Sequence, residues 1–174
     1  MANLTLIGMA GAGKSHVGRR LAERLGYEFL DIDTYLENQY GKELEKIVEE
    51  LGDERFIDVE GKAIIEATNG RDAHVFSPGG SSVYEPEAMD HLGKISRIVY
   101  LRVPFETIQK RIGDSPERMG RIIGIKGQSF RELYDKRAVL YEKYAHHVVD
   151  IGEDAEATLK KIFGFLDMEE AAHA

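Results

Sequence analysis

The sequence contains no cysteine and no tryptophan. The lack of cysteine excludes disulfide bonds, thiolate metal sites and cysteine nucleophiles together. Long apolar runs are also missing, since none approaches the roughly 18 residues that a membrane-spanning helix requires. The first residues lack the charged and then apolar pattern of a secretory signal. We therefore expect a cytoplasmic protein that does not bind membranes.

An excess of positive charge is also missing, with 23 lysines and arginines against 31 acidic residues and a formal net charge of -8. A chain of this charge is not expected to bind nucleic acid, because nucleic-acid sites normally present a basic patch. One segment departs from the average. Between residues 110 and 143 the basic residues include Lys110, Arg111, Arg118, Arg121, Lys126, Arg131, Lys136, Arg137 and Lys143. A local excess of this kind suits a phosphate-bearing ligand.

The chain has 174 residues, of which 43% are hydrophobic, and this is typical of one globular domain. Short strand-like runs alternate with longer helical ones. Strands are expected at 4–7, 27–31, 73–77, 98–101 and 147–151. Helices are expected at 16–25, at 34–68 with breaks near Gly41 and Gly52, at 130–144 and at 155–168.

This alternation predicts an α/β fold of three layers, in which helices cover both faces of a parallel sheet of five strands. The domain is expected to span residues 1–168, and residues 169–174 are expected to form a frayed tail. Ligands of such sheets bind beyond the carboxyl ends of the strands. The residues expected there are Gly11, Asp31, Asp33, Gly79 and Gly80.

The strongest motif is Gly8-Met9-Ala10-Gly11-Ala12-Gly13-Lys14-Ser15, a glycine followed by four residues and then Gly-Lys-Ser. Glycines let the backbone wrap around a phosphate with its amides pointing inward, and the following helix adds its positive end. The lysine is expected to reach the terminal phosphates of ATP, and the serine hydroxyl is expected to bind Mg²⁺. The predicted nucleotide-binding residues are Gly8, Ala10, Gly11, Ala12, Gly13, Lys14, Ser15 and His16.

Two carboxylates follow the second expected strand in Phe29-Leu30-Asp31-Ile32-Asp33. Alternation along a strand would point both toward the same side. Phosphoryl transfer can use one carboxylate near magnesium and one that orients the acceptor hydroxyl or takes its proton. The other interpretation is that an aspartate at this point only caps the following helix.

With these residues the chain resembles the shikimate kinases, within the nucleoside-monophosphate-kinase-like group of P-loop proteins. The resemblance runs from residue 4 to about residue 166, at the Gly8–Ser15 loop, the Asp31–Asp33 segment, the Gly79-Gly80 pair and Arg137. It implies that Asp31 supports magnesium and that Asp33 contacts the hydroxyls of the acceptor. It also implies that Gly79 and Gly80 lie against the substrate, that Arg137 pairs with a substrate carboxylate and that Arg111 stacks on adenine.

Residues 112–127 are predicted to form a mobile lid, because glycines recur there between two helices. A kinase needs such a cover to exclude water from ATP. The resemblance implies that Arg118 is the lid arginine over the transferred phosphate, although the spacing of Arg121 suits the same role.

The substrate-binding half departs from the family pattern at three points, one of which is Met119-Gly120-Arg121, where apolar residues are expected after the lid arginine. Ile57 stands where the family has an arginine that grips the substrate carboxylate, and Ser81 stands where it has a third glycine. Asp53, Glu54 and Glu60 follow the same helical face as Ile57, so this face is expected to be acidic.

Two interpretations of the departures stay open. In one, Arg121 or Lys126 takes over the carboxylate. In the other, the substrate has changed and Glu60 is free to bind a cationic group.

The sequence thus predicts an ATP-dependent kinase that phosphorylates a hydroxyl group of a small molecule, as a monomer or small homo-oligomer. The substrate-binding set comprises Asp33, Ile57, Gly79, Gly80, Ser81 and Arg137, and the catalytic set comprises Lys14, Asp33 and Arg118. The alternative is a nucleotide-binding regulator with weak catalysis. The presence together of Lys14, Ser15, Asp31 and Asp33 argues against it.

Overall fold

The fold is built on one parallel sheet of five strands. The computed structural model describes residues 3–113, 122–152 and 154–172. The strands lie in the order β2-β3-β1-β4-β5, and each pairs in parallel with its neighbour. Their bounds are β1 Asn3–Ile7, β2 Glu28–Asp31, β3 His74–Ser77, β4 Ser96–Arg102 and β5 His147–Asp150.

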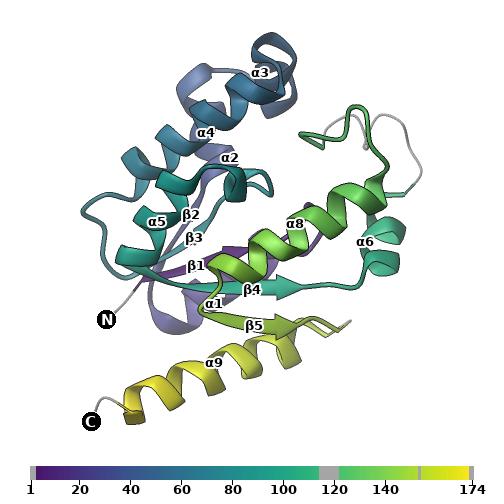
Figure 1. Cartoon of the computed structure of the whole chain (residues 1–174). Helices are drawn as coiled ribbons and strands as arrows, with labels where there is room; N and C mark the ends of the chain where they lie inside the picture. Colours follow the sequence, from purple (N-terminus) through teal and green to yellow (C-terminus); the bar gives the residue numbers. More distant parts are fainter. Residues whose placement is uncertain (1–2, 114–121, 153, 173–174) are drawn as a thin grey trace.

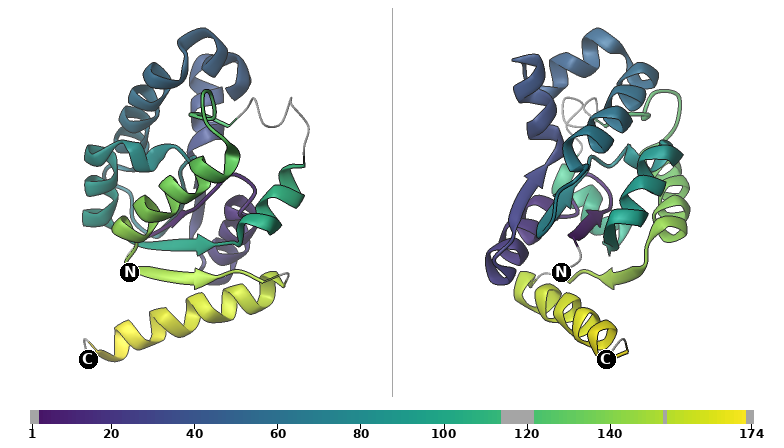
Figure 2. Two further views of the ribbon diagram at one scale, coloured as in Figure 1. Left: turned by 45° about the vertical axis from the view of Figure 1, so that its right-hand side comes forward. Right: turned by 90° about the vertical axis from the view of Figure 1, so that its left-hand side faces the viewer.

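Helices cover both faces of this sheet (Figure 1). Helices α1 (Lys14–Leu25) and α9 (Ala155–Ala172) pack on one face. The other face carries α2 (Ile32–Tyr40), α3 (Leu44–Leu51), α4 (Asp53–Thr68), the short 3₁₀ helix η1 (Ser82–Tyr84), α5 (Pro86–Ile95), α6 (Phe105–Ile112) and α8 (Phe130–Tyr144). Figure 2 shows that α2, α3 and α4 project together at one end, with α9 along β5 on the opposite side. The three-layer α/β architecture expected from the sequence is confirmed.

Side chains that alternate along the central strands fill the two cores. On β4, Val99 and Leu101 are fully buried against α1 and α9, whereas Ile98 and Tyr100 are buried in the core beneath α5 and α8. A strand that is buried on both faces needs apolar residues at every position, not every second one. This explains why the central strands read as continuous hydrophobic runs in the sequence.

Glycines end the helices α2 and α3. Gly41 follows α2 with φ 63°, and Gly52 lies between α3 and α4 with φ 75°. Both values belong to the left-handed region, which glycine adopts without steric cost. The expected breaks near Gly41 and Gly52 are confirmed, and they let three short helices fold into one group.

Several boundaries differ from the sequence-based expectation. Helix α9 continues to Ala172, past the end expected at Met168. The helices α5 and α6 were not assigned from the sequence. Both are short, with 10 and 8 residues, so each repeats its pattern of buried residues over fewer than three turns. No helix in the described ranges is long and apolar enough to span a bilayer.

Truncation of Leu21 on α1 tests the packing between the sheet and the face covered by α1 and α9. Leu21 is fully buried, so Leu21→Ala should lower the free energy of unfolding by about 2–5 kcal/mol. The matched control is Val139→Ala on α8, because Val139 is 67% exposed and its removal should change stability by at most about 0.5 kcal/mol. Urea denaturation midpoints measure both. Equal shifts for the two variants would contradict the assignment of Leu21 to the core.

Candidate active site

The phosphate loop joins the end of β1 to the start of α1. Gly13 adopts φ 91° and no side chain caps the helix behind it. The first intrahelical donor is the amide of Val17, which bonds to the Gly13 carbonyl at 2.9 Å. The amides of residues 14–16 therefore point out of the helix end, where they and the helix dipole favour an anion.

Lys14 lies inside this loop. Its Nζ donates to the carbonyls of Gly8 at 2.9 Å and Met9 at 3.2 Å. Burial lowers the pKa of Lys14, while the charges of Asp33 and Asp31 act in the opposite direction. The ammonium is thus held next to the two carboxylates that the sequence singled out.

Asp31 and Asp33 reach the loop in different ways. Asp31 ends β2 and caps α2, because its Oδ1 accepts from the amide of Asp33 at 3.1 Å. Its Oδ2 accepts from the Ser15 hydroxyl at 2.7 Å. The expectation that both aspartates alternate along one strand was wrong, since α2 begins at Ile32. Asp33 is in the first turn of that helix.

The charge of Asp33 is disfavoured by its surroundings. Burial, followed by the negative charge of Asp31, raises the pKa of Asp33 to about 6, although Lys14 acts in the opposite direction. A carboxylate with this pKa is ionised at neutral pH and still basic enough to accept a proton.

A small cavity of about 80 Å³ opens between Asp33 and the β3–η1 turn. Its lining residues come from the phosphate loop, from α2, α3, α4 and α8, from the β3–η1 turn and from the segment before α8. They are Ala10, Asp33, Leu44, Glu60, Gly79, Gly80, Ser81, Ile122, Ile123 and Arg137. The predicted substrate residues are thus brought together, with the exception of Ile57.

The glycines of the β3–η1 turn have no room for a side chain. A Cβ at Gly79 would collide with Glu60 Oε1 and would lie 3.0 Å from Asp33 Oδ1. A Cβ at Gly80 would lie 3.3 Å from both Arg137 Nη1 and the Tyr141 hydroxyl. Glycine at these positions lets the backbone approach the polar groups of the cavity closely.

Arg137 is fixed on α8 by several groups and is only 1% exposed. Its Nη2 donates to the Ile123 carbonyl at 2.5 Å, and its guanidinium lies over the Tyr84 ring at 5.2 Å. Next to it, the Tyr141 hydroxyl donates to the Gly80 carbonyl at 2.6 Å. The spacing of Tyr141 and Tyr134, seven residues apart on α8, predicts core packing for Tyr141. It is buried, but it also holds the glycine turn in position.

Glu60 also lines the cavity, although it was not in the predicted substrate-binding set. It is fully buried on α4, and its Oε2 accepts from the Ser81 hydroxyl at 2.5 Å. Its Oε1 has no hydrogen-bond partner among the described residues. Burial, followed by the charge of Asp33, raises the pKa of Glu60 to about 7, against the opposing effects of Ser81, Arg137 and Lys14.

The acidic face expected around Ile57 does not form an open surface. Asp53 Oδ2 accepts from the amide of Gly124 at 2.9 Å, and Glu60 is buried. Glu54 is exposed. Ile57 is half-buried and packs against the main core, so this position provides no charge to the cavity.

A second hollow of about 320 Å³ adjoins the phosphate loop on the other side. Gly11, Ala12, Gly13 and His16 line it together with Arg111, whose Nη1 donates to the Gly11 carbonyl at 3.0 Å. Val17, Ala155 and Thr158 also line it, as do Ile151 and Gly152, which follow β5. We had not assigned these two residues from the sequence, although their position directly after a parallel strand was the available signal.

The predicted lid lies only partly within the described residues. Arg118 and Arg121 fall outside them. Ile122 and Ile123 are buried, and Gly124 contacts Asp53 as described above. Lys126, the other candidate for carboxylate binding, is exposed and does not line the cavity.

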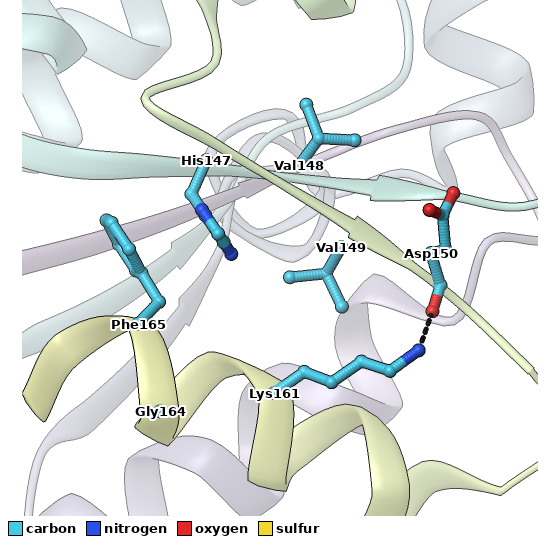
Figure 3. A pocket seen from close by; sticks show the side chains of 7 residues that line it. All are labelled: His147, Val148, Val149, Asp150, Lys161, Gly164 and Phe165. Carbon is cyan, nitrogen blue, oxygen red and sulfur yellow. Dashed lines mark hydrogen bonds between the residues drawn. The ribbon is translucent and has the colours of Figure 1, made fainter. Parts of the chain in front are cut away.

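A third hollow lies between β5 and α9 and contains none of the predicted site residues (Figure 3). The His147 ring stacks on Phe165 with centroids 4.1 Å apart, and Lys161 Nζ donates to the Asp150 carbonyl at 2.7 Å. The lysine covers part of the free edge of β5, a common protection of edge strands. We assign no chemistry to this hollow.

The comparison with known proteins agrees with this geometry. A family model described as "Shikimate kinase" matches residues 10–167. The chain belongs to the shikimate kinase family. The shikimate kinase of Persephonella marina is 32% identical over 164 residues, which cover 94% of this chain and 98% of that protein. The shikimate kinase of Streptococcus gordonii is 34% identical over 147 residues, covering 84% and 88% of the two chains.

Solved structures show the same relationship for this shikimate kinase family member. The shikimate kinase from Acinetobacter baumannii in complex with shikimate has a TM-score of 0.83 at 29% identity, covering 97% of this chain and 94% of that one. A deoxyadenosine kinase from M. mycoides with bound dATP has a TM-score of 0.58 at 21% identity, and this likeness shows the fold alone.

The burial of Glu60 makes a prediction about stability. Its pKa of about 7 in the folded chain exceeds the ordinary value of 4.5. The folded state therefore retains a proton that the unfolded state releases. The stability linked to Glu60 is fully present below pH 4.5 and is lost as the pH rises through 7.

Glu60→Gln removes this titration, so the loss of unfolding free energy between pH 5 and pH 8 should become smaller by on the order of 3 kcal/mol. Glu54→Gln on the exposed side of the same helix is the matched control and should leave the pH dependence unchanged. Denaturant titrations at both pH values measure the difference. If wild type and Glu60→Gln showed the same pH dependence, the pKa of Glu60 would not be raised in the folded chain.

Proposed function

We propose that this member of the shikimate kinase family transfers the γ-phosphoryl group of ATP to a hydroxyl group of shikimate or a related hydroxylated compound. The observation that supports this most directly is the position of Asp33. It lines the substrate-side cavity and lies close enough to Lys14 for each charge to affect the pKa of the other. A phosphate held by the loop and a hydroxyl held by Asp33 would therefore meet.

The residues present fit a nucleotide with magnesium. The uncapped start of α1 and the Lys14 ammonium would hold the phosphates. The Ser15 hydroxyl and Asp31, which are 2.7 Å apart, are the oxygen ligands that Mg²⁺ prefers. No group of three acidic or histidine side chains suited to a metal occurs in the described ranges, so the metal would also rely on phosphate oxygens. Magnesium-ATP, when bound, supplies the phosphoryl group and positive charge at the phosphates.

The other hollow beside the loop would receive the base of the nucleotide. Its walls are Gly11, Gly13, His16 and Arg111 on one side and Ile151 with Gly152 on the other. Arg111 is held by its bond to the Gly11 carbonyl, which keeps its planar guanidinium at the edge of this hollow. A planar cation in this position can stack on an aromatic base.

In the substrate-side cavity, side chains and backbone of this chain would orient the acceptor and remove the proton of its hydroxyl group. Asp33, with its raised pKa, accepts the proton of the acceptor hydroxyl. Gly79 and Gly80 bring their backbone against the acceptor, and the Tyr141 hydroxyl holds that turn in place. Among the described residues that line the cavity, Arg137 is the one with a positive charge, and it would pair with a carboxylate of the acceptor. Arg118 of the lid remains our candidate for neutralising the transferred group.

A nucleotide-binding regulator without catalysis is not favoured. A regulator requires the loop, but it has no need of a base positioned beside Lys14 in a second cavity. The matches to curated shikimate kinases across 84–94% of the chain point the same way.

Replacement of the loop lysine should stop turnover. Lys14→Ala removes the only described ammonium beside the phosphate position, so kcat should fall by about 10²-fold or more. A coupled assay of ADP release with shikimate and related cyclitols measures the change. Undiminished turnover would contradict the role of the loop.

Replacement of the proposed base should separate binding from chemistry. Asp33→Asn should lower kcat by about 10²–10⁴-fold while ATP still binds, because the amide cannot accept the proton. Thr34→Ala, at the next and exposed position, is the matched control and should remain active. Titration calorimetry with ATP and the ADP-release assay give the two readouts. Normal activity of Asp33→Asn would remove the assigned role.

The proposed base also sets a pH dependence. Asp33 has a pKa of about 6 and must be ionised to act, so kcat/KM should fall about tenfold per unit as the pH drops below 6. The measurement is a pH profile at low acceptor concentration. A profile that stays flat down to pH 4.5 would contradict the raised pKa.

A further inference from the structure

One oxygen of the substrate-side cavity is left without a partner. Glu60 is 0% exposed, and its Oε2 is bonded to Ser81, but its Oε1 has no hydrogen-bond partner among the described residues. A buried carboxylate oxygen without a donor costs free energy. Because Glu60 lines the cavity, a ligand there is able to supply the missing donor.

This oxygen lies beside the proposed base. A side-chain carbon on Gly79 would meet both Glu60 Oε1 and Asp33 Oδ1, so the two oxygens converge on the same small space. A molecule that presents a hydroxyl to Asp33 would therefore place a neighbouring substituent against Glu60. The unpartnered oxygen points to recognition of that second substituent.

The charges around Glu60 indicate the nature of the substituent. Asp33 from α2, Lys14 from α1 and Arg137 from α8 act on it electrostatically, and Ser81 contributes a neutral hydroxyl. Lys14 would be engaged by phosphate in the working complex. The described cavity then contains two carboxylates and one guanidinium. Ile57, one helical turn before Glu60, adds no charge.

A ligand whose only charge is a carboxylate would leave this cavity with an excess of negative charge. Its carboxylate would pair with Arg137, and Glu60 would stay uncompensated. A ligand that also carries a cation would satisfy both the charge and the missing hydrogen bond. A neutral hydroxyl would satisfy the hydrogen bond alone.

We propose that Glu60 Oε1 binds an ammonium group of the acceptor, which makes the preferred substrate a hydroxylated acid that also carries an amine. This inference rests on the proposed kinase function and specifies its substrate class. Glu60 acts in binding and Asp33 in proton transfer, so the phosphoryl-transfer step is unchanged. The Ser81 hydroxyl engages Oε2 of Glu60 and leaves Oε1 as the oxygen without a partner among the described residues.

The test compares a set of matched ligands in the presence of ADP and Mg²⁺. One is shikimate, and the others are shikimate analogues in which a single ring hydroxyl is replaced by an ammonium group. Titration calorimetry at pH 8, where Glu60 is ionised, should show at least one amino analogue binding about 10- to 100-fold more tightly than shikimate. Glu60→Gln should abolish this preference, because its amide has no charge to pair with the ammonium.

A reciprocal variant guards against loss of folding in Glu60→Gln. Ile57→Arg adds a guanidinium one turn from Glu60, so it should tighten shikimate binding and weaken binding of the amino analogue. Circular dichroism melting of both variants checks that they fold. The proposal is overturned if shikimate binds as tightly as every amino analogue, if the preference survives in folded Glu60→Gln, or if no analogue binds at millimolar concentration.

A turnover assay separates this proposal from the kinase function. Phosphorylation of shikimate but of none of the amino analogues would leave the kinase function standing and would overturn the ammonium site. Absence of turnover with shikimate, with the analogues and with a panel of cyclitols and sugar acids would overturn the kinase function itself.

Discussion

The site depends on opposite charges that lie close together and partly buried at one edge of the sheet. Lys14, Asp31 and Asp33 come from two different helices and the end of a strand, and each affects the pKa of another. Such a cluster is unfavourable unless its members compensate one another or a ligand completes it. The parallel sheet makes this possible, because it brings the ends of β1, β2 and β3 to the same edge.

Much of the fold was predictable, because its signals are local. Gly41 and Gly52 mark helix ends, the Gly8–Ser15 motif marks a strand-to-helix turn, and continuous apolar runs mark buried strands. The position of Asp33 was not predicted correctly. Alternation along a strand was assumed, whereas Asp31 itself ends the strand by capping α2. Local propensity cannot decide between one more strand residue and a first helical turn when a capping side chain is present.

The substrate half of the site was only partly accessible from the sequence. The spacing of Ile57 and Glu60 predicted that they share one face of a helix. It did not predict how deeply that face is buried in the molecule. Glu60 is buried, and its partner Ser81 is 21 residues further along the chain. Contacts of this kind depend on how α4 packs against the β3–η1 turn, which no local pattern reveals. The role of Tyr141 as a donor to Gly80 was missed for the same reason.

Helix α4 connects the substrate-side cavity to the segment before α8. Its first residue, Asp53, holds the backbone at Gly124, and Glu60 lies two turns further along the same rigid rod. Arg137 extends this connection, since it bonds to Ile123 while lining the cavity. The groups that line the cavity are therefore connected to the backbone at Ile123 and Gly124. Substitutions at Asp53 and at Glu60 would accordingly not have additive effects on affinity.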